Sequence, residues 1–155
     1  MEQGRRQALK TGAGLGMLGA LVAAGLITPA EALAQDWKAA FETRSLADTL
    51  KALGGTAAAD SKDITITAPD IAENGAVVPV AVASAIPKTE SIAILVEKNP
   101  NMLAASFTFP AGTDPSVGTR VKMGQTSNVL ALVKADGKFF VASKEIKVTL
   151  GGCGG

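Results

Sequence analysis

The sequence predicts a mostly β protein: an immunoglobulin-like antiparallel β-sandwich with one N-terminal helix and a flexible, glycine-rich C-terminal arm. Hydrophobic residues alternate with polar ones in seven or eight short runs after about residue 64, which is the period of a strand with one buried face. Turn-forming residues separate these runs at regular intervals, as in a sandwich. The chain has one cysteine, so no disulfide joins the sheets and packing must hold them together.

Residues 1–34 are predicted to be a twin-arginine export signal. Arg5 and Arg6 precede Lys10, a weakly apolar stretch follows over residues 11–28, and Ala32-Leu33-Ala34 has the small-x-small pattern of a signal peptidase site. The apolar stretch is interrupted by glycines and is shorter than the roughly 20 residues of a spanning helix. We therefore expect cleavage after Ala34 and a periplasmic protein that is exported folded and makes no membrane contact after cleavage.

Composition excludes several chemistries. The chain has no histidine, so it has no imidazole general base, no Ser-His-Asp relay and no histidine metal ligand. Residues 35–155 hold as many acidic as basic side chains, and such a neutral body has no field to capture nucleic acid. We expect no nucleic-acid partner, no metal, no cofactor and no catalytic residue, hence no enzyme activity of the chain's own.

The carrier domain is predicted to span residues 35–150 and to begin with a helix over residues 36–53. Asp36 is the expected N-cap and Gly54-Gly55 the expected stop. Hydrophobic side chains at helical spacing form one stripe, which we expect to pack against the sheets rather than against a partner protein. The stripe consists of Trp37, Phe41, Leu46, Leu50 and Leu53.

The alternating runs are predicted to be strands, and Asp136-Gly137 is predicted to be a two-residue hairpin turn. Pro79 predicts an edge strand or a bulge in its run. The runs cover residues 64–67, 78–82, 92–96, 103–109, 121–123, 129–133, 139–141 and 146–150, and the turn signals are Pro69, Asn74-Gly75, Asn99-Pro100, Asp114-Pro115 and Gly118. Two runs, 94–96 and 129–133, are apolar on both faces, so we expect either the helix or a second subunit to cover their outer face.

The tail, residues 151–155, reads Gly-Gly-Cys-Gly-Gly and carries the only thiol. Glycine adds no bulk and explores backbone space freely, so we assign Gly151 and Gly152 to reach and Gly154 and Gly155 to a slim tip. Five extended residues span roughly 16 Å. A free cysteine thiol has a pKa of about 8.5 and is a weak nucleophile at neutral pH. Cys153 is therefore predicted to be an attachment point on which other proteins act.

Four segments and the export signal resemble the SoxY family, the sulfur-carrier subunits of periplasmic thiosulfate-oxidising Sox systems. The segments are residues 148–155 (VTLGGCGG), 68–80 (APDIAENGAVVPV), 96–101 (VEKNPN) and 120–123 (RVKM). The resemblance implies that Cys153 carries S-thiosulfonate and persulfide intermediates of thiosulfate oxidation.

The resemblance also implies partners. A SoxZ-like subunit would form a heterodimer with this chain. A SoxAX-like c-type cytochrome would join thiosulfate to the cysteine, a SoxB-like dimanganese hydrolase would release sulfate, and a SoxCD-like sulfane dehydrogenase would oxidise the remaining sulfur.

Two other functions stay open at this point. One is a ubiquitin-like sulfur carrier that uses a thiocarboxylate on the C-terminal Gly154-Gly155. The other is a structural module that dimerises through Cys153. Lys98, Arg120 and Lys122 either guide an anionic adduct or partner, or are solvated surface charges.

Overall fold

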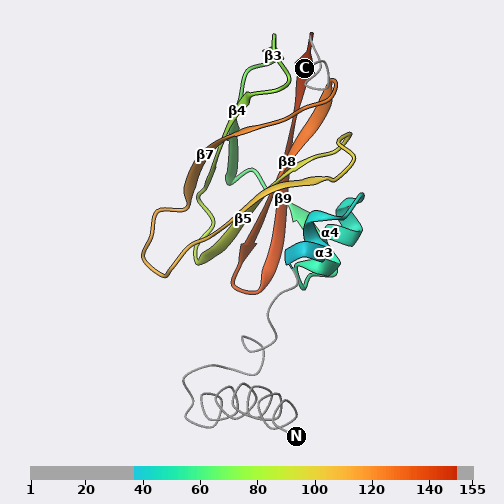
Figure 1. The fold of residues 1–155 in the computed structure, drawn as a ribbon. Coiled ribbons are helices and arrows are strands. Elements are labelled where there is room, and N and C mark those ends of the chain that lie inside the picture. Colours follow the sequence, from blue (N-terminus) through green and yellow to red (C-terminus); the bar gives the residue numbers. More distant parts are fainter. Residues whose placement is uncertain (1–36, 150–155) are drawn as a thin grey trace, which may run out of the picture. The chain divides into compact units, whose positions relative to one another are not determined.

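The computed structural model describes residues 37–149 (Figure 1). The predicted export signal and the predicted arm, with Cys153 and its four glycines, lie outside these residues. The helices are α3 (Trp37–Phe41) and α4 (Leu46–Ala52). The strands are β1 (Ala58–Asp60), β2 (Ile64–Thr67), β3 (Ile71–Ala72), β4 (Val78–Ser84), β5 (Thr89–Val96), β6 (Leu103–Thr108), β7 (Ser116–Val121), β8 (Ser127–Ala135) and β9 (Lys138–Val148).

The strands form two sheets, and the predicted mostly β sandwich is confirmed. The larger sheet has the order β1-β9-β8-β5-β6, with β3 added beside β9, and the smaller has the order β2-β4-β7. The central pairs β5/β8 and β8/β9 are antiparallel. The hairpin at Asp136-Gly137 is also confirmed, because Ala135 pairs with Lys138 and both turn residues have positive φ, 49° and 73°.

The predicted single helix over residues 36–53 is wrong in one respect, because two short helices replace it. Ser45 caps α4 by accepting a hydrogen bond from the Asp48 backbone N–H at 3.1 Å, so a new helix starts where the old one was expected to continue. The Thr43 carbonyl at the break accepts from the Met102 N–H at 2.8 Å. The predicted stop is confirmed, since Gly54 has φ 84° just after α4.

The strand predictions hold for the long antiparallel strands and fail at short or parallel ones. The sequence did not predict β1 and β3, which pair in parallel with the two ends of β9, so the sandwich is not wholly antiparallel. It placed a strand at 121–123 and a turn at Gly118, whereas β7 runs over Ser116–Val121 with Gly118 inside it. One strand, β9 (Lys138–Val148), takes the place of the two runs predicted at 139–141 and 146–150, and Leu150 of the second run lies outside the described residues.

Pro79 shows how a proline fits into a sheet. Its strand, β4, is the middle strand of the small sheet rather than an edge strand. However, β2 pairs with β4 only from Ala81 onward, while Pro79 lies opposite Arg120 of β7. Pro79 thus has a neighbour on one side only and needs no second ladder bond.

The core lies between the two sheets. It is built from alternate residues of the central strands, which are almost fully buried. Its largest fully buried members are Val78, Val80, Val82, Ile92, Ile94, Val96, Met123, Val129, Val133 and Ile146.

A second hydrophobic cluster covers the outer face of the larger sheet. Leu50 and Leu53 of the helical segment pack with Leu95 of β5 and Leu132 of β8, and burying each leucine side chain contributes on the order of 1.5–3 kcal/mol. The helices therefore cover the face that the sequence left open to either a helix or a second subunit. Among the described residues, no helix has the length and hydrophobicity to cross a bilayer.

Candidate functional site

Thr149, directly after β9, is the described residue nearest to Cys153 in the sequence. The structure therefore shows how the base of the predicted arm is held. We call residues 147–149 the arm root. Figure 1 shows the end of β9 beside β3, at the end of the domain away from α3 and α4.

Backbone hydrogen bonds to the β3 segment hold one side of the arm root. The Lys147 N–H donates to the Asp70 carbonyl at 2.9 Å, and the Thr149 N–H donates to the Ala72 carbonyl at 3.1 Å. The Thr149 hydroxyl also donates to the Glu73 carbonyl at 3.2 Å. The parallel pairing thus continues to the last described residue.

A threonine hydroxyl holds the other side. The ladder between β8 and β9 begins with Ser127 opposite Ile146, so β8 offers no backbone acceptor to Val148. The Thr126 hydroxyl takes that place and accepts from the Val148 N–H at 2.9 Å. The arm root is therefore held from two sides.

A lysine ties the middle of β9 to the segment that leads into β3. The Lys144 ammonium donates to the Ala68 carbonyl at 2.6 Å and lies 3.1 Å from an Asp70 carboxylate oxygen. The Asp70 side chain is 91% exposed, so the ion pair itself adds little stability. The bond to the half-buried Ala68 backbone has the clearer role, because it holds the chain just before β3 against β9.

Three of the segments that carried the resemblance meet around this end of the domain. The Met123 N–H donates to the Gly75 carbonyl at 2.7 Å, which joins segment 120–123 to segment 68–80. The Asn99 side chain donates to the Lys122 carbonyl at 2.7 Å, which joins segment 96–101 to them. These segments are far apart in sequence, and hydrogen bonds join the other two to segment 68–80, which holds the arm root.

Sequence reasoning missed the contacts of the arm root. Most of them use backbone carbonyls, which no side-chain pattern reveals, and Thr126 is one threonine among many. The exposure of two aliphatic side chains in segment 68–80 was not predicted either. These are Ile71 and Val77, which are 57% and 54% exposed.

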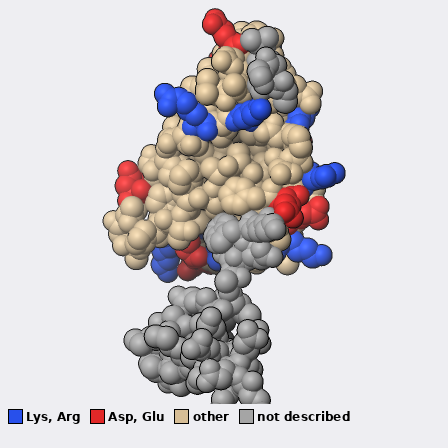
Figure 2. Space-filling view, in the orientation of Figure 1, with Lys and Arg blue, Asp and Glu red and all other residues tan. Residues whose placement is uncertain are grey.

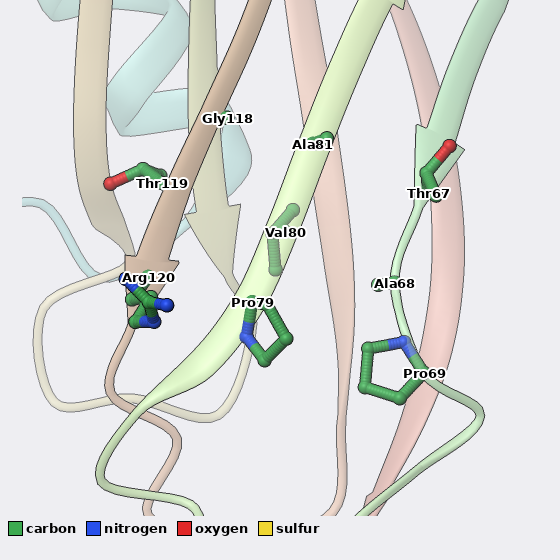
Figure 3. Close-up of a pocket in the computed structure, with 9 residues that line it drawn as sticks. All are labelled: Thr67, Ala68, Pro69, Pro79, Val80, Ala81, Gly118, Thr119 and Arg120. Atoms are coloured by element: carbon green, nitrogen blue, oxygen red, sulfur yellow. The ribbon is translucent and has the colours of Figure 1, made fainter.

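A shallow pocket of about 420 Å³ lies on the outer face of the small sheet. Figure 3 shows Pro79, Val80 and Ala81 of β4 between Gly118, Thr119 and Arg120 of β7 on one side and Thr67, Ala68 and Pro69 on the other. The lining is mainly apolar, and the Arg120 guanidinium is its one charged group. The lining residues include no nucleophile–base pair and no carboxylate, so we assign no bond-breaking role to this pocket.

Two of the three basic residues that the sequence singled out, Lys98 and Lys122, are exposed on the surface. Figure 2 shows that acidic and basic side chains are dispersed over the visible face rather than gathered in one patch of a single sign. Within residues 37–149, no group of three or more Asp, Glu, Cys or His side chains is placed to hold a metal ion.

The family of this chain follows from its similarity to known proteins. The family model described as SoxY, sulfur oxidation protein, matches residues 50–153, a range that ends at the predicted attachment cysteine. No curated protein sequence matches the chain.

Two solved structures differ greatly in likeness. The structure of the sulfur carrier protein SoxY from Chlorobium limicola f thiosulfatophilum is 39% identical, with a TM-score of 0.59, and the alignment covers 66% of this chain and 96% of that one. The human F-spondin reeler domain is 8% identical, with a TM-score of 0.39 over 59% of this chain and 92% of that one, a likeness too weak to support any argument. The match over most of the chain and the close agreement with a sulfur carrier establish that this chain belongs to the SoxY family of sulfur oxidation proteins.

Proposed function

We propose that this chain is a covalent carrier of thiosulfate-derived sulfur, that Cys153 is its attachment site, and that residues 151–155 present the adduct to partner enzymes. Membership of the SoxY family supports the role in sulfur oxidation. The single observation that carries the finer proposal is the position of the only cysteine. It is the third residue from the end and lies between two glycine pairs, just beyond a strand end that is held in place through Thr149.

The chemistry begins with oxidative conjugation. The Cys153 thiol and thiosulfate form an S–S bond, giving Cys–S–S–SO3⁻, one proton and two electrons, and the partner cytochrome takes up the electrons. Water then cleaves the bond between sulfur and the sulfonate group, which releases sulfate and a proton and leaves the persulfide Cys–S–SH. The SoxCD-like dehydrogenase then takes six electrons from the outer sulfur while three water molecules supply oxygen, which gives Cys–S–SO3⁻ and seven protons. A second hydrolysis releases sulfate and a proton and regenerates the thiol.

The division of labour follows from what a tethered thiol can do. A covalent tether keeps reactive sulfur species from diffusing away between enzymes and holds them at high effective concentration. A cysteine between glycines has neither a neighbouring base nor bulk, so the enzyme that receives the arm must supply activation. This chain then supplies the attachment site, and its glycine-rich tail lets the thiol reach into the enzyme without steric hindrance.

The proposal includes export and assembly. Residues 1–34 direct the folded chain to the periplasm by the twin-arginine route, and a SoxZ-like subunit without its own signal travels with it as a heterodimer. The transient partners are the SoxAX-like cytochrome, the SoxB-like hydrolase and the SoxCD-like dehydrogenase. Because the helices already cover the outer face of the larger sheet, the strands that are apolar on both faces no longer argue for the heterodimer. That part of the proposal depends on the family and on the export of folded cargo.

Substitution of the cysteine tests the attachment site. Cys153→Ser should abolish thiosulfate oxidation by cells that depend on this carrier, because no other thiol exists in the chain. The matched control is the double variant Cys153→Ser with Ser143→Cys, which restores a thiol at an exposed position of β9 and should not restore activity. Oxygen uptake with thiosulfate as substrate is the measurement.

The same variant separates the alternatives. A thiocarboxylate carrier would keep working with Cys153→Ser and would fail when Gly154-Gly155 is deleted. A module that only dimerises through Cys153 would lose its disulfide dimer and leave thiosulfate oxidation unchanged. Unchanged oxidation in the Cys153→Ser strain would therefore refute the carrier proposal.

A further inference from the structure

Two exposed aliphatic side chains lie in one short segment beside the arm root. Among the described residues, the large hydrophobic side chains that are exposed are Ile71, Val77 and Phe41, at 57%, 54% and 38%. Two of the three fall within residues 70–77, the segment whose carbonyls bind the arm root. We call residues 70–77 the arm collar.

The arm collar is a fixed part of the domain surface. Ala72 is buried and Gly75 binds the Met123 N–H through its carbonyl. The Asn74 side chain accepts from the Ala76 N–H at 2.9 Å, as in an Asx turn. Ile71 precedes the buried Ala72, and Val77 precedes the fully buried Val78. Ile71 alternates with Ala72 in β3 and Val77 lies directly before β4, so both exposed side chains project from anchored backbone.

The short distance between the arm root and Cys153 restricts how an enzyme reaches the thiol. Thr149 is held by the arm collar, so four residues, 150 to 153, separate the held backbone from the sulfur. Fully extended, they span roughly 13–14 Å. An enzyme with its reactive centre inside a channel must therefore bring the channel mouth up to the domain, where its rim meets the residues around the arm root.

We propose that the arm collar is the docking surface for the enzymes that act on Cys153, and that Ile71 and Val77 contact an apolar rim around the channel each enzyme offers to the arm. This inference rests on the proposed carrier function and adds where the enzymes bind. A few aliphatic contacts suit the task. Small interfaces are typical of transient encounters, and a carrier must leave one enzyme to reach the next.

The test uses the double variant Ile71→Ser with Val77→Ser, in the full-length exported chain with its constitutive partner subunit. Both side chains are more than half exposed, so the substitutions remove apolar contact area without opening the core. Phe41→Ser is the matched control, because Phe41 is the other exposed large hydrophobic and belongs to α3, at the other end of the domain (Figure 1).

Three readouts are compared with those of the unaltered carrier. The first is kcat/KM for conjugation of thiosulfate to the carrier by the cytochrome from the same cells. The second is the rate at which Cys153 reacts with N-ethylmaleimide, a small reagent that needs no docking. The third is the amount of heterodimer, measured by size-exclusion chromatography.

The double variant should lower kcat/KM about ten-fold and leave the maleimide rate and the heterodimer unchanged, while Phe41→Ser changes none of the three. An unchanged kcat/KM in the double variant would overturn the inference. Loss of the heterodimer would also overturn it, because the arm collar would then be the surface of the constitutive partner. If the unaltered carrier accepts no thiosulfate at Cys153, the proposed function itself has failed.

Discussion

At the scale of single residues, two threonine hydroxyls form hydrogen bonds at the arm root that the sequence does not reveal. The Thr126 hydroxyl replaces a strand partner at the point where the β8/β9 ladder has ended, and the Thr149 hydroxyl adds a bond to the Glu73 carbonyl on the side of β3. A threonine beside a predicted strand has many possible roles, so no local pattern singles these two out. The role of Cys153 and its glycines, by contrast, can be predicted from the sequence, because it depends on composition and on position in the chain.

The Thr126 hydroxyl gives a residue-scale prediction. Thr126→Val keeps the shape of the side chain and removes the acceptor for the Val148 N–H, which should cost about 1 kcal/mol. We expect amide hydrogen exchange at Val148 to quicken about five-fold, as that free energy implies, while exchange in the centre of β8 changes little. Exchange rates measured by NMR test this.

The matched control is Thr119→Val on β7, which lines the pocket on the outer face of the small sheet. It should leave exchange at Val148 unaltered. Equal protection of Val148 in the Thr126→Val variant and the unaltered chain would show that the hydroxyl does not hold the arm root.

At the scale of elements, prediction from sequence succeeded where a strand pairs with long antiparallel neighbours. Strands β5 and β8 were found as the apolar runs 92–96 and 129–133, which lie within their observed bounds, Thr89–Val96 and Ser127–Ala135. The short strands β1 and β3 lack such a pattern, because they form only by docking onto the ends of β9. The helix break did have a signal, since Ser45 and Asp48 have capping spacing, but the hydrophobic stripe obscured it.

Packing between α4 and β9 gives an element-scale prediction. A Cβ added at Gly55 would lie 2.7 Å from two ring atoms of Phe139, a ring that belongs to the cluster under the helices. Gly55→Ala should therefore lower the free energy of unfolding by about 1–3 kcal/mol. Urea denaturation measures this change.

Gly118→Ala is the control, because its Cβ would meet only the Ala81 Cβ at 3.9 Å. Its stability should stay within about 0.5 kcal/mol of the unaltered chain. Equal stability of the two alanine variants would show that α4 and β9 are not closely packed at Gly55.

At the scale of the whole molecule, the helices and the arm root lie at opposite ends of the domain (Figure 1). The helices cover the larger sheet at one end (Figure 1), and the arm root with the arm collar forms the other. Sequence patterns predicted the sandwich and left open what covers its outer face, because burial of a second face depends on tertiary contacts. Three of the segments that resembled the family proved to be joined by hydrogen bonds, and one of them, segment 68–80, holds the arm root.

The intact mass of the native carrier, isolated from the periplasm of cells oxidising thiosulfate, tests the central claim most directly. We predict a chain that begins at Gln35, with added mass corresponding to sulfur and to thiosulfonate. A thiol reductant should remove the additions, and proteolysis after Lys147 should place them all on the peptide that contains Cys153. A chain without reducible additions during active oxidation, or with additions on another peptide, would contradict the account.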